Sequence, residues 1–260
     1  MENERKTDRS ADMGMDEHRL SDILLASQIK ATDIYETPPQ IIWIDKSTIA
    51  TLGNFSASTG KAKSKKTFNV SALVAASLAG KQVLNYRAHL PEGKQRILYV
   101  DTEQSRFHCR SVLERILRLA GLPTTTDPEN LDFFCLREYS PSVRVEVIDY
   151  ALRQNKGYGL VIIDGIRDLM LDINDPSESV TVVNALMRWS ATYNIHIHVV
   201  LHLNKNDDHV RGHIGTELNN KAESVLVVKK SNSDQGISEV APLYLRDKDF
   251  KPFAFKVDDD

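Results

Sequence analysis

Residues 60–67, with the sequence GKAKSKKT, combine a glycine, several lysines and a hydroxyl in a spacing that suits phosphate binding. They follow a strand-like run and open a helical one, and they nearly match GxxxxGK[ST], the pattern of a phosphate-binding loop. In such a loop backbone N–H groups surround the β-phosphate, the lysine neutralises γ-phosphate charge and the hydroxyl binds Mg²⁺. The segment predicts a site for a nucleoside triphosphate with Mg²⁺, formed by Gly60, Lys61, Ala62, Lys63, Ser64, Lys65, Lys66, Thr67 and Phe68.

The register of this loop has two interpretations. In the first, Lys66 and Thr67 are the lysine and the hydroxyl, and Lys65 stands where the pattern has its second glycine. In the second, Gly60 and Lys61 form the GK pair, but no glycine then lies five residues earlier and Ala62 replaces the magnesium-binding hydroxyl. We therefore favour the first register, while a lysine-rich solvated loop without a ligand remains an alternative for this segment taken alone.

Carboxylates follow two apolar runs at the positions where strands are expected to end. GLVIIDG ends in Asp164, the form of a Walker B motif whose carboxylate holds magnesium. RILYVDTEQS ends with Asp101 and Glu103, and a carboxylate at the carboxyl edge of a strand can orient and deprotonate an attacking water. Glu103 is thus a candidate catalytic base, with capping of the following helix as its alternative role.

A third run, IHIHVVLHLNK, carries three histidines. His202 comes at its end, where a polar side chain can sense the γ-phosphate, whereas His196 and His198 share one face and are expected to be satisfied interior or surface residues. A metal site of His202, His209 and His213 is an alternative, but no cysteine supports it.

The elements that must position these residues alternate along the chain. Apolar β-rich runs alternate with helical patterns, which is typical of a mostly parallel sheet with crossover helices on both faces. The strand-like runs are IIWI, TIATLGNFSA, RILYV, LDFFCL, GLVIID and IHIHVVLHL, and the helices are expected near residues 67–80, 105–121, 142–155 and 177–193. After ESVLVVKK, the runs APLYLRDK and PFAFKV predict an added antiparallel hairpin.

Composition narrows the class of protein. The 260 residues carry a net charge of -3, so any contact with DNA must come from local patches. No run reaches the ~18 apolar residues that span a bilayer, and two cysteines without a CxxC fit a reduced, cytoplasmic protein with no membrane partner. We expect a disordered N-terminal arm over residues 1–19 and a helix with a linker over residues 20–40, the helix covering residues 20–32.

Together these motifs resemble the RecA-like P-loop ATPases, especially the plasmid RepA type of hexameric replicative helicase and related ATPases of mobile elements. The resemblance spans roughly residues 40–258 and is carried by GKAKSKKT, VDTEQ, VIIDG and VVLHLNK in that order. It implies a RecA-like P-loop NTPase fold over residues 41–260, ATP and Mg²⁺ as ligands, and Lys66, Glu103 and His202 as catalytic residues, with Thr67 and Asp164 at the metal.

The resemblance also implies partners. Arg246 and Lys248, spaced i, i+2 on a late strand, would reach the γ-phosphate of a neighbouring subunit, which implies a homo-oligomer such as a hexamer. Single-stranded DNA would be held by loops after the motif strands, with Lys205 and Arg211 as candidate contacts. The alternatives are a nucleotide-binding switch or scaffold with little hydrolysis, and a recombinase or clock-like relative.

Overall fold

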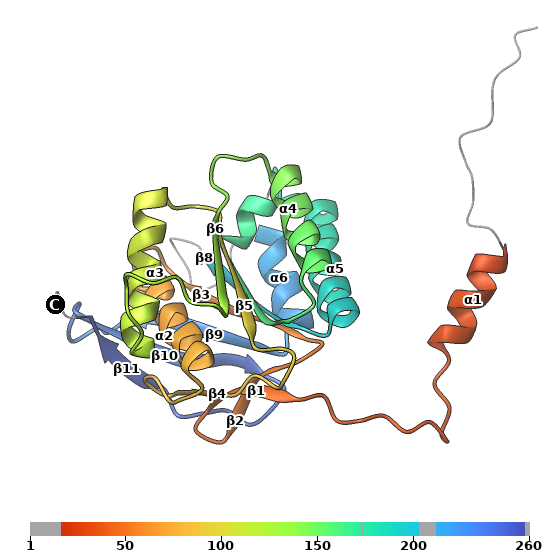
Figure 1. Cartoon of the computed structure of the whole chain (residues 1–260), viewed down its shortest axis with the longest axis horizontal. Coiled ribbons are helices and arrows are strands. Elements are labelled where there is room, and N and C mark those ends of the chain that lie inside the picture. Colours follow the sequence, from red (N-terminus) through yellow and green to blue (C-terminus); the bar gives the residue numbers. More distant parts are fainter. Residues whose placement is uncertain (1–16, 173, 203–211, 258–260) are drawn as a thin grey trace, which may run out of the picture. The chain divides into compact units, whose positions relative to one another are not determined.

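The computed structural model describes residues 17–172, 174–202 and 212–257, and the chain divides into two compact units, residues 1–37 and 38–260 (Figure 1). The first unit contains α1 (Glu17–Ser27), which has no buried residue. This helix begins three residues before the expected start, and it ends at Ser27 rather than at residue 32. A turn follows it, in which Asp33 accepts a hydrogen bond from the backbone N–H of Lys30 at 2.8 Å.

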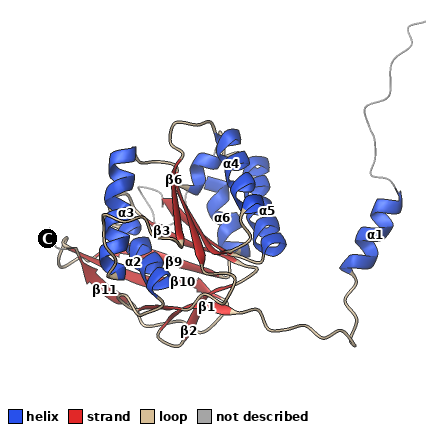
Figure 2. Ribbon diagram, in the orientation of Figure 1, coloured by secondary structure: helices blue, strands red, loops and turns tan. Residues whose placement is uncertain are grey.

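The second unit is built on an eight-stranded sheet with the order β11-β10-β9-β3-β8-β7-β5-β6 (Figure 2). The strands from β9 to β6 in this order run parallel, and β10 and β11 are antiparallel additions at one edge. The expected C-terminal antiparallel hairpin is therefore confirmed. The strands are β3 (Phe55–Gly60), β5 (Arg96–Asp101), β6 (Leu131–Cys135), β7 (Tyr158–Asp164), β8 (His196–His202), β9 (Ser224–Lys230), β10 (Ile237–Leu245) and β11 (Phe253–Lys256).

Helices cover both faces of this sheet, as Figure 1 shows. Alternate strand residues feed two separate apolar cores: in β5, Ile97 and Tyr99 join one core, and Leu98 and Val100 join the other. The first core includes residues of α2 (Lys66–Ala79) and α3 (Arg106–Ala120). The second packs under α4 (Pro141–Gln154), the short η1 (Ile166–Leu169), α5 (Pro176–Tyr193) and α6 (Gly212–Lys221).

The first strands of this unit do not join the parallel sheet, so that part of the sequence prediction is wrong. β1 (Gln40–Ile44), β2 (Ser47–Thr51) and β4 (Tyr86–Ala88) form a separate antiparallel sheet with the order β2-β1-β4. The run TIATLGNFSA is two strands, because Gly53 adopts a φ of 82° between β2 and β3. Asp45, with a φ of 53°, starts the tight turn that reverses β1 into β2.

The side chains of the small sheet complete the core on the α2 face. Ile41, Ile42, Ile44 and Ile49 are fully buried and belong to the same apolar cluster as α2. In the described part of the chain, no helix is both long enough and apolar enough to cross a membrane.

Candidate nucleotide-binding site

The loop of residues 61–65 lies between the end of β3 at Gly60 and the start of α2 at Lys66. Its backbone has to turn sharply, and Lys63 and Lys65 both adopt the left-handed conformation, with φ values of 63° and 67°. Glycine is the residue that takes this conformation at least cost, which explains the glycine in the common pattern. The loop also lies close to β9: a Cβ on Gly60 would come within 2.3 Å of the carbonyl oxygen of Val228. Gly60 therefore admits no side chain.

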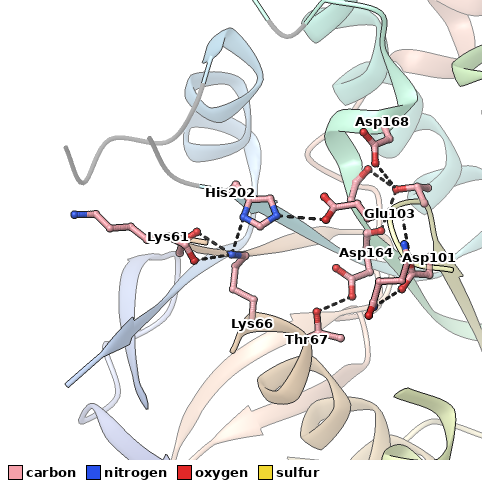
Figure 3. Close-up of polar contacts among 12 residues, drawn as sticks. Lys61, Lys66, Thr67, Asp101, Glu103, Asp164, Asp168 and His202 are labelled. Atoms are coloured by element: carbon pink, nitrogen blue, oxygen red, sulfur yellow. Dashed lines mark hydrogen bonds and ion pairs between the residues drawn. The ribbon is translucent and has the colours of Figure 1, made fainter. Parts of the chain in front are cut away.

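Lys66 is the buried cation of the loop (Figure 3). Its Nζ donates to the carbonyl oxygens of Gly60 at 2.9 Å and Lys61 at 3.0 Å, and to Nδ1 of His202 at 2.9 Å. Burial lowers the pKa of Lys66 to about 8, an effect that the negative charges of Asp164 and Glu103 oppose. The geometry favours the register with Lys66 and Thr67 as the functional pair, since Lys66 opens the helix.

Thr67 and Asp164 face each other across the same site. Thr67 Oγ1 donates to Asp164 Oδ2 at 3.1 Å, and the hydroxyl of Tyr99 donates to the same oxygen at 2.9 Å. Burial, followed by the neighbouring charge of Asp101, raises the pKa of Asp164 to about 7. A hydroxyl and a buried carboxylate in contact form an oxygen donor set of the kind that Mg²⁺ prefers, and a divalent cation would remove the cost of that buried charge. These two residues therefore fit a magnesium ion.

Glu103 and His202 come together from the ends of β5 and β8. Their side chains are 40% and 34% exposed, and His202 Nε2 lies 3.4 Å from Glu103 Oε2. This hydrogen bond is the main cause that lowers the pKa of Glu103, although burial opposes it. Asp101 holds the backbone at Glu103 and Gln104, because its Oδ1 accepts from the N–H groups of Glu103 at 3.0 Å and Gln104 at 2.8 Å. Glu103 is thus an ionised carboxylate held at the carboxyl edge of the sheet.

Thr102 and Asp168 lie beside this site. Thr102 was not identified from the sequence, and for Asp168 the sequence favoured a solvated helix start over a place in the magnesium shell. Thr102 Oγ1 lies within 3.1 Å of the carbonyl oxygens of Asp164 and Gly165 and of Asp168 Oδ2, so it ties the β5 and β7 ends together. Gly165, with a φ of 105°, leaves the space for this hydroxyl: a Cβ there would lie 2.2 Å from Thr102 Oγ1. The only sequence signal was a threonine between two carboxylates after an apolar strand.

Two adjoining cavities lie at this edge of the sheet. One, of about 290 Å³, has Lys66, Thr67, Glu103, Asp164 and His202 among its lining residues. The other, of about 500 Å³, shares Phe68, Ser111 and Arg115 with the first and continues toward Phe255. The guanidinium of Arg115 stacks on the ring of Phe68, 3.5 Å from its centroid. The charged cavity thus continues into one with flat and apolar walls.

Comparison with known proteins decides the family. A family model described as an AAA domain matches residues 20–208, most of the chain. The chain belongs to the AAA domain family. Among solved structures, it is similar to the one titled "Crystal structure of the RadB recombinase", with a TM-score of 0.55 and 14% identity over 80% of this chain and 88% of that chain. This likeness shows a RecA-like fold, so the expected fold class is confirmed. No curated protein matches the chain.

The fold does not bring every candidate residue to this site. Arg246 and Lys248 lie beyond the end of β10, so the prediction that both project from one face of a strand is wrong: the ladder ends at Leu245. Arg246 Nη2 donates to the carbonyl oxygen of Lys221 at 3.1 Å. Lys221 precedes β9, so this contact lies at the amino ends of the parallel strands, whereas the phosphate loop lies at their carboxyl ends.

Some of the other candidate residues lie outside the residues that the structure describes. Lys205 and Arg211, the candidate DNA contacts, lie outside them, as does His209 of the alternative metal site. Of that histidine trio, His202 contacts Lys66 and Glu103, and His213 is exposed on α6. Within the described residues, no group of three or more His, Cys, Asp or Glu side chains is placed to hold a metal ion.

Proposed function

We propose that this AAA domain is a Mg²⁺-dependent ATPase. One observation carries the proposal: a cation, a hydroxyl–carboxylate pair and a second carboxylate, from three different segments, surround one cavity at the carboxyl edge of a parallel sheet. Ligands of open α/β sheets bind at that edge. ATP is the proposed substrate.

In this proposal each residue has a role that follows from its contacts. Lys66 and the backbone N–H groups of the loop bind the phosphates, with Lys66 neutralising the charge that develops in the transition state. Thr67 and Asp164 hold the metal. A bound Mg²⁺ supplies charge stabilisation to the phosphate oxygens. Glu103 accepts the proton of the attacking water, and its lowered pKa keeps it ionised at neutral pH. His202 links Glu103 to Lys66 and so connects the base to the phosphate end.

The second cavity suits the base of the nucleotide. It adjoins the phosphate end at Phe68, and the Arg115–Phe68 stack presents flat surfaces to an aromatic ring. We place ATP with its phosphates in the cavity of about 290 Å³ and its adenine in the cavity of about 500 Å³.

We further propose that the ATPase works as a ring-forming motor on single-stranded DNA in the cytoplasm, of the plasmid RepA helicase type or as a replication or mobilisation ATPase of a mobile element. The resemblance of the motifs supports this role. Arg246 and Lys248 lie at the opposite edge of their own sheet, so only a neighbouring subunit can present them to the cavity. Lys205 and Arg211 are the proposed DNA contacts. We expect the protein to assemble into a homo-oligomer such as a hexamer.

Phosphate release from Mg-ATP, with and without single-stranded DNA, tests the proposal. We expect DNA to raise turnover, and we expect Lys66→Ala to abolish it. Lys61→Ala removes a loop lysine that is not the GK lysine in our register, and it should reduce turnover far less than Lys66→Ala does. Equal losses in the two variants would contradict the register, and turnover that ignores DNA would contradict the motor.

A second candidate is a nucleotide-binding switch or scaffold with little hydrolysis. Lys65 favours it, because a side chain stands where the common loop has a glycine. Nucleotide binding that depends on Lys66, without phosphate release under any of these conditions, would decide for the switch.

A further inference from the structure

Lys65 is the residue at which the loop departs from the common glycine, and its side chain leaves the loop. It precedes α2 with a left-handed backbone, φ 67° and ψ 34°. Its Nζ donates to the carbonyl oxygen of Gly236 at 2.9 Å, in the turn between β9 and β10. The backbone at position 65 suits a glycine, but the residue there is a lysine. Its side chain joins the phosphate loop to the β9–β10 turn, which is distant in sequence.

The same side chain also lines the cavity in which we place the phosphates. Gly236 offers Lys65 a neutral carbonyl oxygen, whereas a nucleotide offers charged phosphate oxygens. Both contacts have an ionised donor, but only the phosphate oxygen carries a negative charge, so the phosphate adds a Coulomb attraction to the ammonium that a carbonyl oxygen lacks. A phosphate in the cavity consequently competes with Gly236 for the ammonium group of Lys65.

We propose that Lys65 is a positioning residue that exchanges partners when nucleotide binds: its ammonium leaves the carbonyl oxygen of Gly236 for a phosphate oxygen, and this releases the β9–β10 turn from the loop. The inference rests on the proposed function, because it needs a nucleotide in the cavity. The exchange makes the turn report whether the site is filled.

The released turn borders a third, lysine-rich cavity of about 450 Å³. One wall is the phosphate loop and the other is the end of β9 with the turn, and the Lys65–Gly236 hydrogen bond ties these walls together. Partner exchange at Lys65 therefore changes the shape of a basic surface beside the nucleotide. The lining residues are Lys61, Ala62, Ser64, Lys229, Lys230, Asn232 and Gln235.

The turn has its own hydrogen bonds, which make it measurable. The N–H of Gly236 donates to Asp234 Oδ1 at 2.7 Å, the N–H of Ile237 to the carbonyl oxygen of Asp234 at 3.0 Å, and the N–H of Ser231 to the carbonyl oxygen of Ile237 at 3.0 Å. Amide hydrogen exchange of residues 231–237 reads the opening of these bonds. Loss of one ordinary supporting hydrogen bond corresponds to about fivefold faster exchange.

The experiment compares exchange of this turn in the full chain, with and without a non-hydrolysable ATP analogue and Mg²⁺ at a concentration that a binding titration shows to be saturating. In the wild type we expect nucleotide to speed exchange of the turn about fivefold. Lys65→Met keeps the length of the side chain and removes its charge, so the turn should exchange fast without nucleotide and should not respond to it. Lys65→Arg keeps a donor and should keep the response.

Lys63 offers a matched control, since it lines the same cavity and has a similar φ of 63°. Lys63→Met removes one charge from the same loop but leaves the Lys65–Gly236 bond, so the turn should still respond to nucleotide. A wild-type turn that is unchanged or slowed when nucleotide binds would overturn the exchange of partners and leave the ATPase proposal standing. A response that survives in Lys65→Met would also overturn it. If wild type and Lys66→Ala both fail to bind nucleotide, both proposals fall.

Discussion

Strand β8 carries three histidines in two contrasting settings. His196 and His198 lie in the interior of the sheet and are fully buried, whereas His202 stands at the carboxyl end with a third of its side chain exposed. The interior pair hydrogen-bonds to hydroxyls and a carbonyl, with Glu223 Oε2 3.8 Å from His196 Nδ1, whereas the terminal histidine hydrogen-bonds to a cation and a carboxylate. The position along the strand thus decides the setting: the two histidines within β8 are part of the core, and the histidine at its end lies in the candidate site.

The interior contacts form one chain of hydrogen bonds with a defined direction. The carbonyl oxygen of Thr51 can only accept, so His196 donates to it from Nδ1 at 2.8 Å. His196 Nε2 then accepts from Ser56 Oγ at 2.7 Å, and Ser56 Oγ accepts from His198 Nδ1 at 2.7 Å. His198 Nε2 accepts from Ser58 Oγ at 2.9 Å. Burial lowers the pKa of both interior rings well below neutral pH, so both are neutral, and these partners place their proton on Nδ1.

His202 takes the opposite tautomer. The ammonium of Lys66 can only donate, so Nδ1 of His202 accepts and the ring proton sits on Nε2, facing Glu103. One strand thus holds two tautomers, each set by its partners. The two interior histidines belong to the core of the fold, and His202 belongs to the candidate site; the following predictions test that division.

The largest expected effect is a loss of stability when an interior histidine is replaced. His198→Leu removes the partner of Ser58 and one partner of Ser56 inside the sheet, and we expect it to lower the free energy of unfolding by about 3 kcal/mol. Urea unfolding followed by circular dichroism measures this loss. His202→Leu is the matched control and should cost less than about 1 kcal/mol. Equal losses would show that the two settings do not differ.

The next largest effect is a loss of ATP turnover when the histidine at the end of β8 is replaced. His202→Leu should lower ATP turnover roughly 10- to 100-fold, because Glu103 and Lys66 lose the ring that connects them. Steady-state phosphate release measures it, and nucleotide affinity measured in parallel shows whether binding survives. Unchanged turnover would remove His202 from the site.

A smaller effect is the pH dependence of stability. Burial lowers the pKa of His196 to about 4 and that of His198 to about 3, below the ~6.5 of an unfolded chain. The unfolded state then binds more protons below pH ~6.5, so stability is complete above that value and falls as pH decreases toward 4, by about 1.4 kcal/mol per unit for each histidine. Urea unfolding at pH 7, 6 and 5 tests this, and His198→Leu should have the shallower slope.

The smallest effect is spectroscopic. Nitrogen chemical shifts of the imidazole rings should assign the proton to Nδ1 in His196 and His198 and to Nε2 in His202 at neutral pH. The same tautomer in all three rings would contradict the assignment of their partners.

The sequence carried much of this organisation. Periodic apolar runs predicted the parallel sheet and its helices, and the polar residues that follow each run predicted which side chains would meet, because the carboxyl ends of parallel strands share one edge. Glu103, Asp164 and His202 were found in this way. Their catalytic roles stay predictions.

The features that the sequence did not reveal depend on which strands pair with one another and on where each strand ends. An apolar run such as IIWI does not say which strand it will pair with, so the small antiparallel sheet was missed. Arg246 and Lys248 were assigned to a strand that ends one residue earlier. The contact between Lys65 and Gly236 joins residues 171 positions apart, and local pattern gives no signal for it.

The most direct test of the account is Glu103→Gln, which keeps the size of the side chain and removes the base. Phosphate release from Mg-ATP and binding of a fluorescent ATP analogue are measured together, with Glu92→Gln, an exposed loop glutamate, as the matched control. We expect turnover to fall at least about 100-fold while nucleotide affinity stays within about threefold. Turnover equal to that of the wild type, or a loss explained by lost binding alone, would contradict the placement of the catalytic base at the end of β5.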